Sequence, residues 1–199
     1  RDMAYPTVSG PYGLVPINLI GGQVFAGATR QIPIATNSST AIYFGDVVKL
    51  SSTGTLDKDT GTSAATPVGV FLGCTYTDPV FGTTFRQYYP GTTNITDIEA
   101  YVQDDPDALF KVAVVTTGTT ISYVTRANVG ENAVLVQTSG STITGDSKVA
   151  VSSTTGTTSS WPIRIIDVIP ETQSSAGSYT EVVVKWNQGM HQYLNPTGV

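Results

Sequence analysis

The sequence predicts an all-β protein, and three observations support that fold class. Strand-forming residues are abundant, with 31 Thr, 23 Val and 13 Ile, whereas helix formers are scarce, with 8 Leu, 4 Glu and 5 Lys. No twelve-residue window places apolar residues at the spacing of an amphipathic helix. Short apolar runs alternate instead with glycine, proline and small polar residues. We therefore expect a β-barrel or sandwich of about ten short antiparallel strands.

Residues 1–36 are expected to form an extended N-terminal arm. A β-rich domain is expected over residues 37–199, either alone or with a peripheral hairpin subdomain. Four prolines and five glycines exclude a helix from this arm. Its apolar content is too high for a solvated linker, so it should lie against the chain's own core or against another subunit. The candidate interface residues of the arm are Tyr12, Leu14, Val15, Ile17, Leu19, Ile20 and Phe25.

The segment 42–76 is expected to organise the domain. The first strand, residues 30–34, leads into it. Residues 42–50 are rich in β-branched side chains, and Gly54 follows where a tight turn needs a residue that tolerates positive φ. A second short strand and a polar loop come next. Residues 67–76 then form an apolar run bounded by turn residues, which is typical of a buried strand.

Residues 77–96 are predicted to form a loop that is unusually rich in aromatic side chains. Exposed aromatic residues in a long loop are typical of interfaces, because their rings bury a large area at little cost in rotamer entropy. A loop that folds back onto its own core would have the same composition, so both interpretations stay open. The candidate interface residues are Phe81, Phe85, Tyr88 and Tyr89.

The second half of the chain predicts further strands. Residues 97–115 alternate in polarity on either side of an acidic turn at 104–107, which indicates a strand, a turn and a strand. Residues 163–169 and 179–186 should form a hairpin across the polar loop 171–178. Other strands are expected at residues 119–125 and 133–138, and Val149 to Val151 are followed by a Ser/Thr/Gly tract at 152–160.

Charge and composition exclude several classes of function. The net charge is −5 and no run of Lys or Arg occurs, so we expect no nucleic-acid or membrane partner. No apolar stretch is long enough to span a bilayer, and no signal pattern is visible at the N-terminus, which favours synthesis in a cytoplasm. A single cysteine, Cys74, rules out an intramolecular disulfide framework and is expected to act as a small buried hydrophobe.

The sequence carries no catalytic pattern that we would assign. His191 is the only histidine, which argues against histidine-based nucleophile activation and a zinc cage. Asp59-Thr60-Gly61 matches the tripeptide of aspartic proteases, but it occurs once and follows Lys58. Residues 57–61 begin like a calcium loop, yet Val68 occupies the twelfth position, and the acidic residues at 104–107 are ordinary turn chemistry. We expect no enzymatic activity, no metal and no cofactor.

Several segments, in order along nearly the whole chain, resemble a family of tailed-phage virion structural proteins. These segments are YPTVSGPYGLVPINLIGGQVFAGATRQIPI at the start, GDVVKL at 45–50, PVGVFLG at 67–73, YVQDDPDALFKV at 101–112, TSGSTITGDSKVAV at 138–151, and IRIIDVIP with VVVKWNQGMHQY at the end.

The resemblance implies a capsid decoration or cement protein with no catalytic residues. Such a protein would lie on the capsid exterior, bind the major capsid protein, bridge neighbouring capsomers and self-associate, as a homotrimer. It would be made in the cytoplasm of a bacterial host. The alternative is another virion component, such as a tail-tube, fibre-base or host-surface-binding module.

Overall fold

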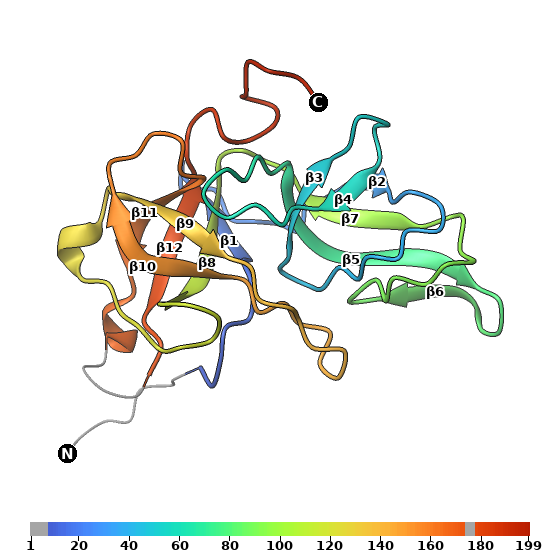
Figure 1. Ribbon diagram of the computed structural model, residues 1–199, viewed down its shortest axis with the longest axis horizontal. Coiled ribbons are helices and arrows are strands. Elements are labelled where there is room, and N and C mark those ends of the chain that lie inside the picture. The colour runs from blue at the N-terminus through green and yellow to red at the C-terminus, as the bar shows by residue number, and fades with distance from the viewer. Residues whose placement is uncertain (1–7, 174–177) are drawn as a thin grey trace.

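The computed structural model describes residues 8–173 and 178–199, and it confirms the all-β fold class (Figure 1). Twelve strands are present in these ranges, and the helical segments there are two 3₁₀ turns, Arg126–Asn128 and Pro170–Thr172. The strands form two sheets, which lie beside each other along the long axis of the molecule as two lobes (Figure 1).

The first sheet closes into a five-stranded barrel. Strands β8, β10, β9, β11 and β12 pair in this order, and β12 pairs back onto β8. Strand β1 extends this sheet, because it pairs with the first half of β8 while β10 pairs with the second half. The strands of this sheet are β1 (Val15–Leu19), β8 (Ala108–Val115), β9 (Asn132–Val136), β10 (Ala150–Gly156), β11 (Ile163–Val168) and β12 (Glu181–Trp186).

The second sheet is formed mostly by the segment 42–103. Its order is β2-β7-β5-β3-β4, and β6 pairs with the far half of β5. A parallel bridge between Ile34 and Leu56 connects the two ends of this order. The strands are β2 (Arg30–Pro33), β3 (Val47–Leu50), β4 (Leu56–Lys58), β5 (Gly69–Asp78), β6 (Gly82–Arg86) and β7 (Glu99–Gln103).

Each lobe has an apolar core because side chains alternate between the faces of a strand, and the barrel's cluster continues across the junction to Val47 of β3 and Val70 of β5. In the barrel, Phe110 and Trp186 pack with ring centroids 5.3 Å apart, and both belong to a large buried cluster. In the second sheet, Phe71 and Tyr89 are fully buried in a separate cluster. The prediction that residues 67–76 contain a buried strand is confirmed by β5.

The expected boundary at residue 36 does not separate two structural units. Strand β1 belongs to the barrel, whereas β2 lies in the second sheet, so the segment crosses from one lobe to the other. Leu14 is fully buried in the barrel core. Leu19 packs against the same core, and Ile32 and Ile34 are buried in the second cluster, whereas most of residues 20–31 are exposed; residues 1–7 lie outside the described ranges.

Two local predictions are wrong, each for a physical reason. Residues 119–125 form only a bridge between Ile121 and Val115, because both edges of β8 are already paired. Residues 77–96 contain β6, whose partner is the long strand β5. Strand β10 continues through Gly156 into the polar tract, because threonine is β-branched and suits an extended backbone.

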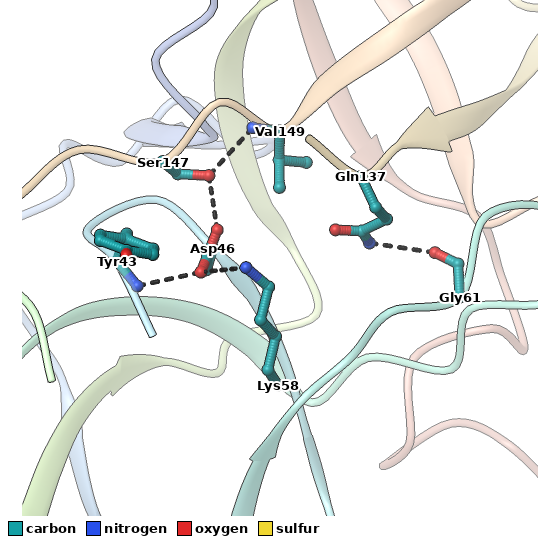
Figure 2. A network of polar contacts seen from close by, with 7 residues as sticks. All are labelled: Tyr43, Asp46, Lys58, Gly61, Gln137, Ser147 and Val149. Atoms are coloured by element: carbon teal, nitrogen blue, oxygen red, sulfur yellow. Dashed lines mark hydrogen bonds and ion pairs between the residues drawn. The ribbon is translucent and has the colours of Figure 1, made fainter. Parts of the chain in front are cut away.

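A buried carboxylate, Asp46, links the two lobes (Figure 2). Its Oδ2 accepts hydrogen bonds from the Tyr43 backbone N–H at 2.9 Å and from the Lys58 ammonium at 2.7 Å, both from the second-sheet lobe. Its Oδ1 accepts from the Ser147 hydroxyl at 2.6 Å, and Ser147 Oγ accepts from the Val149 N–H at 3.0 Å. Residues 147–149 lead into β10, so one carboxylate connects both lobes.

Backbone contacts surround this carboxylate. The Leu14 N–H donates to the Gly45 carbonyl at 3.0 Å, and the Gly13 N–H donates to the Val149 carbonyl at 3.2 Å. Gly13 has φ of +84°, and a Cβ there would lie 2.7 Å from the Gly45 oxygen, so only glycine fits. The N-terminal segment is therefore held between the two lobes.

The C-terminal segment forms a second connection. The Gln192 side chain makes two hydrogen bonds to the backbone of Leu50 in β3, at 2.7 and 3.1 Å. The Tyr193 hydroxyl donates to Asp104 at 2.8 Å. His191 is fully buried beside Trp186 of the barrel, with ring centroids 6.5 Å apart. One short segment thus contacts both lobes.

The Asp46 network predicts a large loss of stability when the carboxylate is removed. Asp46→Ala leaves the Lys58 ammonium buried without its partner, which should lower the free energy of unfolding by about 3–5 kcal/mol. Asp57→Ala is the control, because Asp57 makes no side-chain hydrogen bond among the described residues, and it should change stability by less than about 0.5 kcal/mol. Urea unfolding of both variants measures this, and equal effects would contradict the assigned role.

His191 predicts an acid-dependent loss of stability. Burial lowers its pKa below the usual 6.5, because the charged ring loses hydration; Asp104 and Asp105 oppose this effect and Lys185 adds to it. Below about pH 6.5 the unfolded chain binds a proton at His191 that the folded chain does not bind. The free energy of unfolding therefore falls as the pH is lowered, by up to about 1.4 kcal/mol per pH unit. The fall ends at the pKa of His191 in the folded state.

His191→Phe should remove this component of the pH dependence. The measurement is the free energy of urea unfolding at about pH 7.5 and about pH 5.5 for the wild type and the variant. The carboxylates are the same in both proteins, so the difference between the two pH profiles isolates His191. Identical profiles would show that His191 does not contribute.

Candidate interaction surfaces

Large apolar side chains are exposed on turns that project from the two lobes. At the β5–β6 hairpin, Val80 is 79% exposed, Phe81 76% and Phe85 64%. We call these three residues the hairpin knob. Ile143 is 95% exposed in the loop between β9 and β10, residues 137–149. Figure 1 shows that the hairpin turn lies at the far end of the second-sheet lobe, and that the β9–β10 loop projects from the barrel.

The tip of the hairpin is held rigid by its own polar contacts. One carboxylate oxygen of Asp78, Oδ1, accepts hydrogen bonds from the N–H groups of Val80 at 2.8 Å and Phe81 at 3.1 Å. Gly82 closes the turn with φ of +75°, a conformation that favours glycine. The apolar side chains at the tip are thus presented on a fixed backbone, which lowers the entropy lost when a partner binds.

Phe85 extends the knob along the hairpin. It lies opposite Thr75 in the β5–β6 ladder. Its ring packs beside Tyr101 at a centroid distance of 5.9 Å and lies over Gly73, where the absence of a side chain makes room. One face of the ring therefore contacts the sheet, while most of the side chain remains exposed.

The β9–β10 loop is also fixed by local hydrogen bonds. The Ser141 N–H donates to the Asp146 carbonyl at 2.9 Å, and the Gly145 N–H donates to the Ser141 carbonyl at 2.8 Å. The Gln87 amide donates to the Asp146 carboxylate at 2.7 Å and so connects this loop to the chain beyond β6. Ile143 is consequently presented at a defined position.

Two of the four aromatic candidates in residues 77–96 lie inside the molecule. Tyr89 is fully buried, and its hydroxyl contacts the carbonyls of Ser38 at 2.7 Å and Thr92 at 2.9 Å. Tyr88 is half-buried and stacks on Tyr43 at a centroid distance of 5.5 Å. Tyr89 is therefore a core residue, and its assignment to an interface is wrong. Phe81 and Phe85 are the exposed members of the set.

The arm candidates divide in the same way. Leu14 is fully buried, so its interface assignment is wrong; Val15, Ile17 and Leu19 are half-buried in β1. The Tyr12 hydroxyl donates to Glu181, and burial together with this carboxylate raises the pKa of the phenol. Phe25 is half-buried. Ile20 remains exposed at 50%.

Sequence reasoning missed the two most exposed aliphatic residues of these turns, Val80 and Ile143. Val80 follows the turn residues Asp78 and Pro79, and Ile143 precedes the turn residues Thr144 and Gly145. A large apolar residue inside a turn signal is a detectable pattern, since turns are normally solvated. The pattern alone does not tell whether the side chain folds inward.

The reactive groups of the described chain are poorly placed for covalent chemistry. Cys74 is buried, and burial raises the pKa of its thiol to about 12, so the nucleophilic thiolate is scarce at neutral pH. No group of three or more metal-ligating side chains lies together in residues 8–173 and 178–199. No helix within those ranges is long and apolar enough to cross a membrane.

Comparisons with protein-family models, with curated proteins and with solved structures found no match to this chain.

The knob is predicted to be dispensable for folding. Replacing both Val80 and Phe81 by Ser should change the free energy of unfolding by less than about 0.5 kcal/mol, because both side chains are largely exposed. Phe71→Ala in β5 serves as the contrast, since it empties a fully buried site and should cost about 3–5 kcal/mol. Urea unfolding compares them at a protein concentration low enough for every protein to be monomeric, because self-association would add to the apparent stability. A large loss in the double Ser variant would show that the knob packs against the chain.

Proposed function

We propose that this protein is a non-enzymatic structural component of a phage virion, which binds the outside of the capsid and bridges neighbouring capsomers. Its partners in this proposal are the major capsid protein and further copies of itself, with the homotrimer as the expected assembly. The resemblance of its segments to virion structural proteins is the starting point. The observation that carries the proposal is the presence of large apolar side chains on rigid projecting turns.

Exposed apolar residues on fixed turns favour contact as the function. Solvated turns ordinarily carry small polar residues, so phenylalanine and isoleucine there reduce solubility without contributing to the core. Such side chains typically anchor protein interfaces. The carboxylates and hydroxyls near these turns, Asp78 and Ser141, hold the backbone.

Bridging requires at least two separate contacts, and the described chain offers two. The hairpin knob lies on the second-sheet lobe and Ile143 on a loop of the barrel lobe. In an oligomer, several such contacts act together, and each later contact is intramolecular once the first has formed. Weak individual contacts could thus give stable attachment to a shell.

We assign the shell contact to the β9–β10 loop.

This assignment predicts that Ile143→Asp weakens binding to capsids. The substitution places a charge at the centre of the proposed contact, which should reduce affinity at least about tenfold, a difference of about 1.4 kcal/mol. The assay is co-sedimentation with shells assembled from the major capsid protein of the same virus. Thr142→Ser, a conservative change in the same loop, is the control. Failure of the wild-type protein to bind shells would refute the proposed function.

A further inference from the structure

We propose that the hairpin knob of one molecule docks, head to tail, into a pocket on the outside of the barrel of a second copy. The inference deepens the proposed function by naming the partner of the knob, and it rests on the self-association that this function includes. It does not depend on binding to a capsid.

The pocket lies beside the ends of β11 and β12 and has a volume of about 370 Å³. That volume falls within the usual range for small-ligand pockets and leaves room for a phenyl ring. Its apolar walls come from the loop after β1, from β11, from β12 and from the C-terminal segment, through Ile20, Ile166, Trp186 and Leu194. Ile20 and Leu194 are 50% and 48% exposed, so the pocket presents apolar surface to solvent.

The pocket also carries a positive charge that no carboxylate of residues 8–173 or 178–199 neutralises. Arg164 is exposed on β11 and is held by the side-chain oxygens of Asn132 at 3.0 Å and Asn187 at 3.2 Å. It forms no ion pair within the described residues, whereas Lys185, also at the pocket, is paired with Asp107 at 2.9 Å. Neutral amides orient the guanidinium and leave its charge available to a partner.

The hairpin knob is chemically complementary to this pocket. Phe81 and Val80 are the apolar group, and Asp78 lies at the base of the same turn. Only Oδ1 of Asp78 is used to hold the turn, so Oδ2 remains to accept from a guanidinium. One turn therefore offers an aromatic ring and a carboxylate to a pocket that offers apolar walls and an unpaired arginine.

The charge distribution favours a second copy as the occupant. Residues 24–107, which include the second sheet and its hairpin, contain four Lys or Arg and nine Asp or Glu, a net charge of −5. The remaining residues contain six of each sign and are neutral overall. Docking the acidic lobe against the neutral barrel lobe avoids the repulsion of two acidic lobes, which a symmetric pairing of hairpins would produce.

The knob cannot reach the pocket of its own chain. Figure 1 shows the hairpin turn at the far end of one lobe, while β11 and β12 lie in the other lobe. The contact is therefore between different surfaces of two molecules. Repetition of such a contact closes a ring when the rotation permits, and the expected homotrimer is one such ring.

Two variants with complementary defects test this geometry. The knob variant carries Val80→Ser and Phe81→Ser, and the pocket variant carries Arg164→Glu and Ile166→Ser. We expect the wild type to be oligomeric in sedimentation velocity over a concentration series, and each variant alone to associate at least about tenfold more weakly. An equimolar mixture should form one-to-one heterodimers, because one intact knob meets one intact pocket and no ring can close.

Specified outcomes overturn the proposal. The proposal is contradicted by a monomeric wild type. It is also contradicted by a variant that assembles like the wild type, or by a mixture without heterodimers, when circular dichroism shows that the variants are folded. If the pocket variant does not fold, a mixture of Thr83→Cys and Gln188→Cys proteins replaces it. Both exposed positions lie beside the contact and leave its apolar side chains intact, so under air oxidation a disulfide-linked dimer is expected in that mixture alone. Ile143→Asp is the control and should assemble normally. Capsid binding by a monomeric wild type would contradict this inference and the proposed self-association, and would leave the proposed attachment to the capsid standing.

Discussion

The structure depends on one buried carboxylate, Asp46, at the place where two separate β-lobes meet. Its two oxygens accept hydrogen bonds from Lys58 and Tyr43 on one side and from Ser147 on the other (Figure 2). Burying this charge is costly in itself, and the cost is offset because Lys58 supplies the opposite charge and both carboxylate oxygens accept hydrogen bonds. A network of this kind adds directional contacts to the apolar packing across the junction, where Val47 and Val70 of the second-sheet lobe join the barrel cluster.

A fixed arrangement of the lobes matters for a protein whose proposed role is contact. The hairpin knob and Ile143 lie on different lobes, so the distance between them is set by the junction. The C-terminal segment reinforces that junction, since Gln192 binds the backbone of β3 while His191 packs beside β12. At the turns themselves, side-chain oxygens of Asp78 and Ser141 hold the backbone in place. Rigidity at both levels reduces the entropy lost on binding.

The uneven distribution of charge suggests how copies of the chain would be oriented. An acidic lobe with an aromatic tip and a neutral lobe with an unpaired arginine are complementary, so self-association and attachment to a shell can use different surfaces. A head-to-tail contact through the knob leaves Ile143 on the β9–β10 loop available to a second partner. The protein could then connect its own copies and the shell at the same time, which is the requirement for a bridging protein.

The sequence alone determined the fold class and most strand positions, because β-branched residues, turn residues and two-residue alternation are local properties. It did not determine which strands pair. Residues 97–115 read as a strand, a turn and a strand, yet β7 and β8 lie in different sheets, since pairing depends on edges supplied by distant segments. The exposure of Phe81 and the burial of Leu14 and Tyr89 could not be predicted from the sequence either, because all three are large apolar residues next to glycine or proline. Only the tertiary structure decided which of them had a core to enter.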